Sequence, residues 1–220
     1  MSSRTGTPHS VSWYATILVS GRAVSARDHQ QRVRPSVIAE GYATADMALH
    51  CYLGHGASGT SASMKPFVDG LRARGIDAAA IDLPKRKAEE AIAAFHKVVP
   101  DEADVVVGGH SYGGRVASLA AAEPGSPYAA LVLFSFPLHP PGSPDRTAAR
   151  TAHFPSIRCP ALFLSGESDP FARIELLREA VTQLGGPTQL HTYPRLGHGL
   201  LPVLDDALDR VAAFLSAMPR

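Results

Sequence analysis

Apolar runs alternate with amphipathic stretches along most of this chain. Short apolar runs predict buried strands over residues 47–53, 78–83, 103–107, 129–134, 160–164 and 189–193. Apolar positions at helical spacing predict helices over residues 63–74, 89–99, 115–122, 145–154, 171–184 and 205–218. Strands that alternate with helices form βαβ units with right-handed crossovers. The pattern therefore predicts an α/β fold, in which a mainly parallel sheet is flanked by helices on both faces.

Residues 1–45 form an N-terminal extension in which the pattern is weaker. Residues 14–20 and 36–42 have the character of short strands, while residues 22–34 are polar and highly charged. We expect either an antiparallel edge hairpin or a poorly ordered leader. The apolar stretch around residue 17 is interrupted by Ser and Thr and is followed closely by Arg22, so a signal peptide is not expected. Residues 46–220 contain no linker and are predicted to form a single domain.

The overall composition limits the classes of partner. The 220 residues are 45% hydrophobic, enough for one well-buried core, and the net charge is only +1. Because the charges nearly balance, neither nucleic acid nor an anionic membrane is expected as a partner. No apolar run approaches the length of a membrane span. Cys51 and Cys159 lie far apart, in or beside apolar runs, as is typical of free thiols in a reducing compartment. We therefore expect a cytoplasmic protein.

The residues with a recognisable chemistry centre on a Gly-rich turn at residues 108–114. A β-branched strand leads into Gly109-x-Ser111-x-Gly113, and an alanine-rich helix leads out of it, which is the pattern of a nucleophile elbow. A side chain at either glycine would collide with a neighbouring strand or helix where the backbone reverses. Short Gly-x-Ser-x-Gly matches also arise by chance in loops. It is the strand before the turn and the helix after it that predict Ser111 as a nucleophile.

A serine nucleophile needs a base, and the base needs an acid that holds its tautomer. His198 lies between two glycines after the last predicted strand, where packing gives no reason for a histidine, and is the predicted general base. Asp169 follows the strand at residues 160–164 and is the predicted acid. We favour Asp169 over Glu167 because the position before Pro170 favours an extended backbone at a turn. A helix N-cap is the alternative role for Asp169.

Two backbone N–H groups are predicted to form an oxyanion hole. One belongs to Tyr112, directly after the nucleophile, at the start of a helix whose positive dipole end favours an oxyanion. The other belongs to Ala57, in the Gly-rich turn at residues 55–59 that follows the first predicted strand. Loss of one such donor typically costs about a hundred- to a thousandfold in rate. No metal or organic cofactor is needed, and no zinc-ligand spacing is present.

From about residue 47 to residue 218 the chain resembles small, lidless members of the α/β-hydrolase superfamily, whose triad has the chain order Ser111, Asp169, His198. Within the superfamily it resembles the group related to dienelactone hydrolases, which also includes the hydrolase-like domains of testis-expressed and NSL-complex proteins. The motifs that carry this resemblance are His55-Gly56-Ala57-Ser58-Gly59, Gly109-His110-Ser111-Tyr112-Gly113-Gly114-Arg115 and Phe136-Pro137-Leu138-His139-Pro140-Pro141-Gly142. The resemblance implies an α/β-hydrolase fold with no large cap domain. Dienelactone hydrolases proper use a cysteine where this chain has Ser111, so a dienelactone substrate is not implied.

These features together predict a serine hydrolase that cleaves a carboxylic ester or a related acyl bond through an acyl-enzyme. Amide, thioester and peptide bonds are alternatives that the sequence does not separate. A non-catalytic binding or scaffold module with the same fold is the alternative from a different class. The segment over residues 135–160 is too short for a large cap, which predicts an open, shallow site and a small or flexible acyl substrate.

Several polar residues near the predicted site are interpreted as structural. His55 is expected to form hydrogen bonds behind the oxyanion turn, and His110 to pack beside the elbow. His139 follows a central strand near the expected pocket mouth, where it either touches substrate or stabilises its loop. Asp82 is expected to cap a turn, and the basic run at residues 85–87 to lie on a solvated loop or helix start.

Overall fold

The computed structural model describes residues 48–218. The N-terminal extension, with the strands considered for residues 14–20 and 36–42, lies outside the described residues. Among the described helices, none combines the length and the apolar character needed to cross a membrane.

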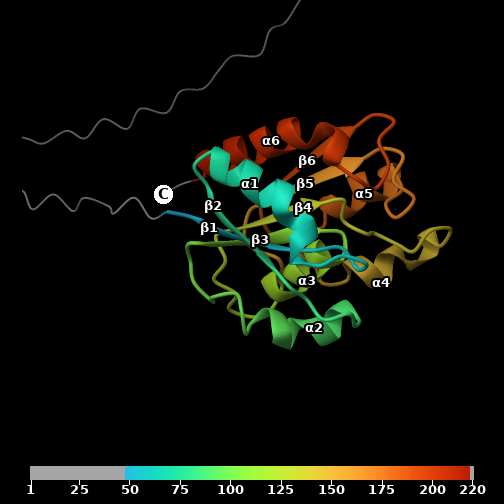
Figure 1. Ribbon diagram of the computed structural model, residues 1–220. Coiled ribbons are helices and arrows are strands. Elements are labelled where there is room, and N and C mark those ends of the chain that lie inside the picture. The colour runs from blue at the N-terminus through green and yellow to red at the C-terminus, as the bar shows by residue number, and fades with distance from the viewer. Residues whose placement is uncertain (1–47, 219–220) are drawn as a thin grey trace, which may run out of the picture. The chain divides into compact units, whose positions relative to one another are not determined.

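Within residues 48–218, six strands form one sheet in the order β2-β1-β3-β4-β5-β6 (Figure 1). They are β1 (His50–Gly54), β2 (Asp77–Ile81), β3 (Val105–His110), β4 (Ala130–Phe134), β5 (Ala161–Gly166) and β6 (Thr188–Tyr193). Every neighbouring pair is parallel, as predicted, so the carboxyl ends of the strands meet at one edge. Ligand sites of open α/β sheets lie at that edge.

Helices cover both faces of the sheet. On one face α1 (Lys65–Ala73) packs against α6 (Leu204–Ser216), and on the other α2 (Ala88–Phe95) packs against α3 (Tyr112–Ala121) (Figure 1). The remaining helices are the short α4 (Thr147–Thr151) and α5 (Ile174–Val181). α5 buries its apolar side in the same cluster as α2 and α3. The predicted α/β architecture is therefore confirmed.

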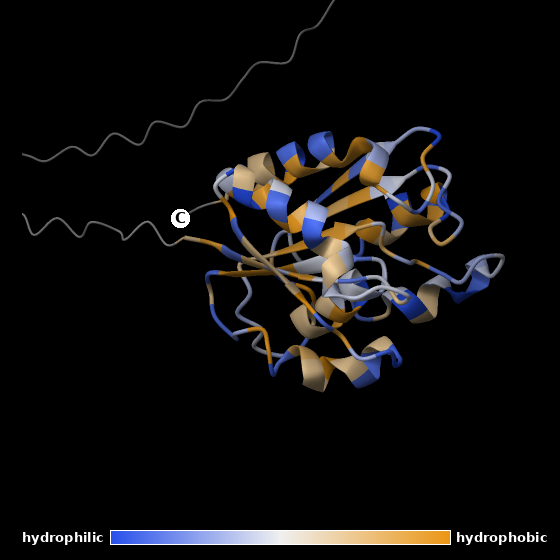
Figure 2. Ribbon diagram, viewed as in Figure 1, coloured by the Kyte–Doolittle hydropathy of each residue, from blue (hydrophilic) through white to orange (hydrophobic). Residues whose placement is uncertain are grey.

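Alternate strand residues contribute to two apolar clusters, one on each face of the sheet. Along β3, Val105 and Val107 belong to the cluster under α2 and α3, whereas Val106 belongs to the cluster under α1 and α6. Leu133 and Phe134 of β4 divide in the same way. This is the pattern of strands that are buried on both faces. Figure 2 shows the central strands in apolar orange and many polar residues on α1 and α6.

β3 is longer than predicted, and this extension carries the chain to the edge of the sheet. The strand continues past residue 107 to His110, even though two glycines weaken its local strand propensity. Pairing with both neighbours overrides that propensity, because Gly109 pairs with Gly54 of β1 and His110 pairs with Phe134 of β4. The predicted nucleophile therefore follows the last paired residue of a central strand.

The connection from β4 to β5 is less regular than predicted. In place of one helix over residues 145–154, α4 is flanked by 3-10 turns at Pro144–Arg146 and Phe154–Ser156, since Pro155 has no N–H with which to extend the helix. α5 likewise begins at Ile174 and not at residue 171. In the described chain, this connection contains no large cap domain, as the resemblance implied.

Candidate active site

Ser111 occupies a strained turn between β3 and α3. Its φ of 52° and ψ of −111° lie outside the regions that non-glycine residues usually adopt. Two backbone hydrogen bonds hold this conformation. The N–H of Ser111 donates to the carbonyl of Phe134 at 2.9 Å, and the carbonyl of Ser111 accepts from the N–H of Arg115 at 3.0 Å. The strand ladder and the first turn of the helix thus fix the serine from both sides.

The two glycines of the elbow motif both pack against Gly54 of β1. A Cβ at Gly109 would lie 2.3 Å from the carbonyl oxygen of Gly54, and a Cβ at Gly113 would lie 2.1 Å from its carbonyl carbon. Contacts this short do not occur between real atoms, so both positions require glycine. This agrees with the steric reason that the sequence motif suggested.

The structure brings the three predicted triad residues together in one hydrogen-bonded chain. His198 Nε2 lies 2.8 Å from Ser111 Oγ, and His198 Nδ1 lies 2.8 Å from Asp169 Oδ2. An ionised carboxylate only accepts hydrogen bonds, so Nδ1 carries the ring proton and Nε2 presents its lone pair to the serine hydroxyl. The Asp169 side chain is fully buried, while 22% of the His198 side chain is exposed.

Asp169 belongs to a turn, residues 167–173, that we call the acid loop. Its second oxygen, Oδ1, accepts the N–H of Phe171 at 2.8 Å, so both carboxylate oxygens have partners. Glu167, the rival acid, is held elsewhere. Its Oε1 accepts hydrogen bonds from Arg178 at 3.1 Å and from Thr192 at 2.8 Å. Of the two acids that the sequence offered, Asp169 is therefore the one in contact with the histidine.

Two rings flank the imidazole of His198. The ring centroid of Phe171 lies 4.5 Å from that of His198, and the centroid of His110 lies 5.1 Å away on a different element. His110 Nε2 also donates a hydrogen bond to the backbone carbonyl of His198 at 3.1 Å. Burial lowers the pKa of the His110 imidazole below its ordinary value. The neutral form of His110 is therefore favoured beside His198. The packing role expected for His110 fits these contacts.

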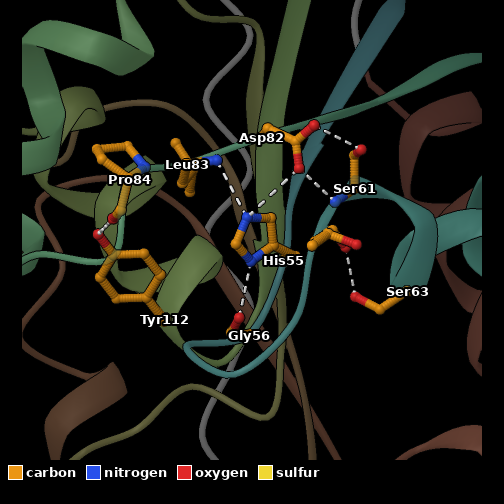
Figure 3. Close-up of polar contacts among 9 residues, drawn as sticks. His55, Gly56, Ser61, Ser63, Asp82, Leu83, Pro84 and Tyr112 are labelled. Atoms are coloured by element: carbon orange, nitrogen blue, oxygen red, sulfur yellow. Dashed lines mark hydrogen bonds and ion pairs between the residues drawn. The ribbon is translucent and has the colours of Figure 1, made fainter.

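Figure 3 shows how His55 supports the turn at residues 55–59. His55 Nδ1 donates to the carbonyl of Gly56 at 2.7 Å, and Nε2 accepts the N–H of Leu83 at 3.0 Å. The backbone carbonyl of His55 accepts the N–H of Gly113 at 2.9 Å. The imidazole is 2% exposed, so it cannot face a substrate. It joins this turn to Leu83 in the loop after β2, in the structural role that the sequence suggested.

The loop after β2 also contacts the chain just beyond this turn, at Ser61. Asp82 accepts both the N–H and the hydroxyl of Ser61, at 2.7 and 2.8 Å, and these hydrogen bonds lower the pKa of its carboxyl (Figure 3). The hydroxyl of Tyr112 donates to the carbonyl of Pro84 at 2.7 Å. Asp82 thus caps the turn that begins at Ser61, as predicted. The hydrogen bond of the Tyr112 hydroxyl ties the residue after Ser111 to the loop after β2.

The two predicted oxyanion donors lie on the elements expected of them. Tyr112 is the first residue of α3, so its N–H has no acceptor within the helix. Ala57 is exposed at the tip of its turn, after the carboxyl end of β1. Among the hydrogen bonds of residues 48–218, none uses the N–H of Ala57 or of Tyr112. Both groups are thus unpaired donors that follow neighbouring strands. In the same range, no three His, Cys, Asp or Glu side chains lie close enough together to hold a metal ion.

The sequence model of one protein family, the alpha/beta hydrolase domain, matches residues 48–216. The chain belongs to this family. Among curated proteins, none matches this alpha/beta hydrolase. The match confirms the predicted membership of the α/β-hydrolase superfamily.

Solved structures support the same fold assignment. A monoacylglycerol lipase from Paleococcus ferrophilus has a TM-score of 0.64 at 14% identity, over 75% of this chain and 94% of the lipase. The esterase Pf2001 from Pyrococcus furiosus has a TM-score of 0.63 at 16% identity, over 78% and 81%. A dienelactone hydrolase from Anabaena variabilis has a TM-score of 0.57 at 20% identity, over 79% and 88%. At these identities the likeness shows the fold alone.

One residue of this alpha/beta hydrolase's site was missed by the sequence reasoning. Phe171 was predicted only as the first residue of a helix, yet its ring lies against His198 and its N–H binds Asp169. The available signal was its position two residues after the predicted acid, where a turn and not a helix follows the strand.

Proposed function

We propose that this protein is a serine hydrolase that cleaves a carboxylic ester or a related acyl bond. The observation that carries the proposal is the chain of two 2.8 Å hydrogen bonds from Ser111 through His198 to the buried Asp169. A serine hydroxyl, an imidazole in the required tautomer and a carboxylate behind it are the parts of nucleophilic acyl transfer. The strained backbone of Ser111 and the unpaired N–H of Tyr112 support the same reading.

In the first half of the reaction, Ser111 Oγ attacks the acyl carbon and His198 Nε2 takes its proton. Asp169 stabilises the imidazolium that forms, because its carboxylate already accepts the Nδ1 proton. The carbonyl oxygen becomes an oxyanion, which the N–H groups of Ala57 and Tyr112 bind. Collapse of this intermediate breaks the bond to the leaving group, which takes the proton from Nε2. The acyl group is then held as an ester of Ser111.

In the second half, water replaces the leaving group. His198 Nε2 takes a proton from the water, and the hydroxide formed attacks the acyl-enzyme. A second oxyanion forms in the same place, and its collapse returns the proton to Ser111 and releases the acid. Every proton transfer in both halves passes through His198 Nε2. The mechanism needs no cofactor. The short connection between β4 and β5 favours small or flexible acyl substrates.

A fluorophosphonate probe tests the proposal directly, because it modifies only activated serine nucleophiles. We expect the parent protein and the control Ser156→Ala, at an exposed serine in the 3-10 turn Phe154–Ser156, to be labelled, and Ser111→Ala to remain unlabelled. An unlabelled parent would reject the enzyme and favour a binding module. Labelling of Ser111→Ala would show that another residue is the nucleophile. Turnover of p-nitrophenyl esters of graded chain length then measures acyl preference.

A further inference from the structure

His139 is a buried histidine that the proposed reaction does not use. It lies in the loop after β4, within Pro137-Leu138-His139-Pro140-Pro141-Gly142, and is 4% exposed. A side chain so deeply buried does not reach a substrate in an open site. Because buried polar groups are nearly always hydrogen-bonded, the partners of its ring nitrogens indicate its role.

The two ring nitrogens of His139 have opposite roles. Nδ1 lies 2.9 Å from the carbonyl oxygen of Pro140, which only accepts, so Nδ1 carries the proton. Nε2 lies 3.1 Å from the backbone nitrogen of Arg173, whose N–H only donates, so Nε2 presents its lone pair. The ring is therefore held in one tautomer with both nitrogens satisfied.

His139 forms two hydrogen bonds with the acid loop. Its ring accepts the N–H of Arg173, and its own backbone N–H donates to the carbonyl of Phe171 at 2.9 Å. The N–H of Phe171 binds one oxygen of Asp169, while the other oxygen of Asp169 binds His198. The ring of Phe171 also lies against the ring of His198. A continuous set of contacts thus leads from His139 to the predicted base.

We propose that His139 is a positioning residue, which fixes the acid loop and thereby the hydrogen bond between Asp169 and His198. The inference rests on the proposed function, since the bond that it protects is the one that orients the base. A catalytic group misplaced by about 1 Å costs about a hundredfold in rate. Because the side chain of His139 does not reach the surface of the site, its loss lowers kcat and leaves KM unchanged.

Substituting asparagine or glutamine for His139 distinguishes the contributions of its two ring nitrogens. In His139→Asn the amide lies near the Nδ1 position, so it keeps the bond to Pro140 but does not reach Arg173. In His139→Gln the amide lies near the Nε2 position, and its oxygen accepts the N–H of Arg173. With a p-nitrophenyl ester we expect kcat to fall about 10- to 100-fold in the Asn variant. We expect kcat of the Gln variant to stay within about threefold of the parent, and KM of both within about twofold.

The same hydrogen bond can be removed from its other end. Arg173 has a φ of −54°, which proline adopts, so Arg173→Pro deletes the N–H and leaves His139 in place. Arg173→Ala keeps the N–H and is the matched control. We expect the Pro variant to reproduce the kcat loss of His139→Asn and the Ala variant to keep the parental kcat. His153→Leu, which removes a half-buried imidazole bonded to Ser118 on α3, should lower stability without changing kcat.

The downfield proton resonance of His198 Nδ1–H reports its hydrogen bond to Asp169 without any catalysis. We expect this resonance in the parent and in His139→Gln, and its loss or upfield shift in His139→Asn. Equal kcat losses in the two variants, or a parental kcat and resonance in His139→Asn, would overturn the role of His139. A parent that fluorophosphonate fails to label would overturn the proposed function instead, and the resonance would still test His139.

Discussion

Replacing Asp169 by asparagine perturbs the proposed triad at its buried end. The carboxylate accepts two hydrogen bonds, from the N–H of Phe171 and from His198 Nδ1, whereas an amide has only one acceptor oxygen. When that oxygen keeps its bond to Phe171, the NH₂ group faces Nδ1, which must then give up its proton in order to accept. The ring proton moves to Nε2, and His198 no longer takes the proton of Ser111.

The expected loss of activity is large because the wrong tautomer blocks the general base itself. In a serine-protease triad the same change lowers kcat by about 10⁴. At about 1.36 kcal/mol per tenfold, this is about 5.4 kcal/mol of transition-state stabilisation. The folded state loses much less, about 1–3 kcal/mol, since asparagine has nearly the same volume and keeps one hydrogen bond. We therefore expect Asp169→Asn to be folded and to turn over about 10⁴ times more slowly.

Glu167→Gln is the matched control for this experiment. Glu167 contacts Arg178 and Thr192, and its side chain is 31% exposed, so we expect kcat within about threefold of the parent and a stability change below about 1 kcal/mol. Initial rates of p-nitrophenyl acetate hydrolysis give kcat and KM, and thermal unfolding gives stability. A larger kcat loss in Glu167→Gln would reverse the assignment of the acid. Parental kcat in Asp169→Asn would refute the tautomer argument.

Three further predictions concern stability and thiol reactivity. Gly113→Ala places a Cβ 2.1 Å from the backbone of Gly54 and should lower the free energy of unfolding in urea by about 3 kcal/mol, whereas Gly199→Ala, with open space around it, should change it by less than about 1 kcal/mol. Burial lowers the pKa of His153 from 6.5 to about 4, so the unfolded chain binds more protons between these values. Stability should therefore fall as the pH is lowered from 6.5 to 4, and His153→Leu should flatten that part of the curve. Burial raises the pKa of Cys51 to about 12, so this thiol should react with a disulfide reagent only after unfolding; fast labelling of the folded protein would contradict the burial.

The positions of the proposed triad residues could be predicted because they depend mainly on the topology of the sheet. Ser111, Asp169 and His198 each follow a strand, and parallel pairing alone brings the carboxyl ends of those strands to one edge. The choice between Asp169 and Glu167 was harder, since both lie on one turn. It depends on where each side chain points, and partners 11 and 25 residues away hold Glu167 aside.

Contacts between loops could not be predicted from the sequence. The bond between His139 and Arg173 joins residues 34 positions apart, and neither loop has a periodic pattern that would reveal the pairing. The apolar spacing of residues 171–184 predicted a helix from its first residue. In the structure, Phe171 and Arg173 donate their N–H groups to side chains, so helical hydrogen bonding begins only later. The local sequence pattern gives no sign that distant side chains compete with the helix for these N–H groups.

At the closest approach of β1, β3 and α3, Gly54, Gly109 and Gly113 meet through backbone atoms alone. The spacing between Ser111 and the turn at residues 55–59 is therefore fixed by the main chain, whatever side chains line the mouth of the proposed site. Substrate selectivity then depends on exposed residues of the surrounding loops, and these residues do not set the spacing. In the proposed hydrolase, the reaction and the choice of substrate therefore have separate physical determinants. If the proposal holds, a new acyl preference can be engineered, or can evolve, by substitutions in the loops while the geometry of the proposed triad stays unchanged.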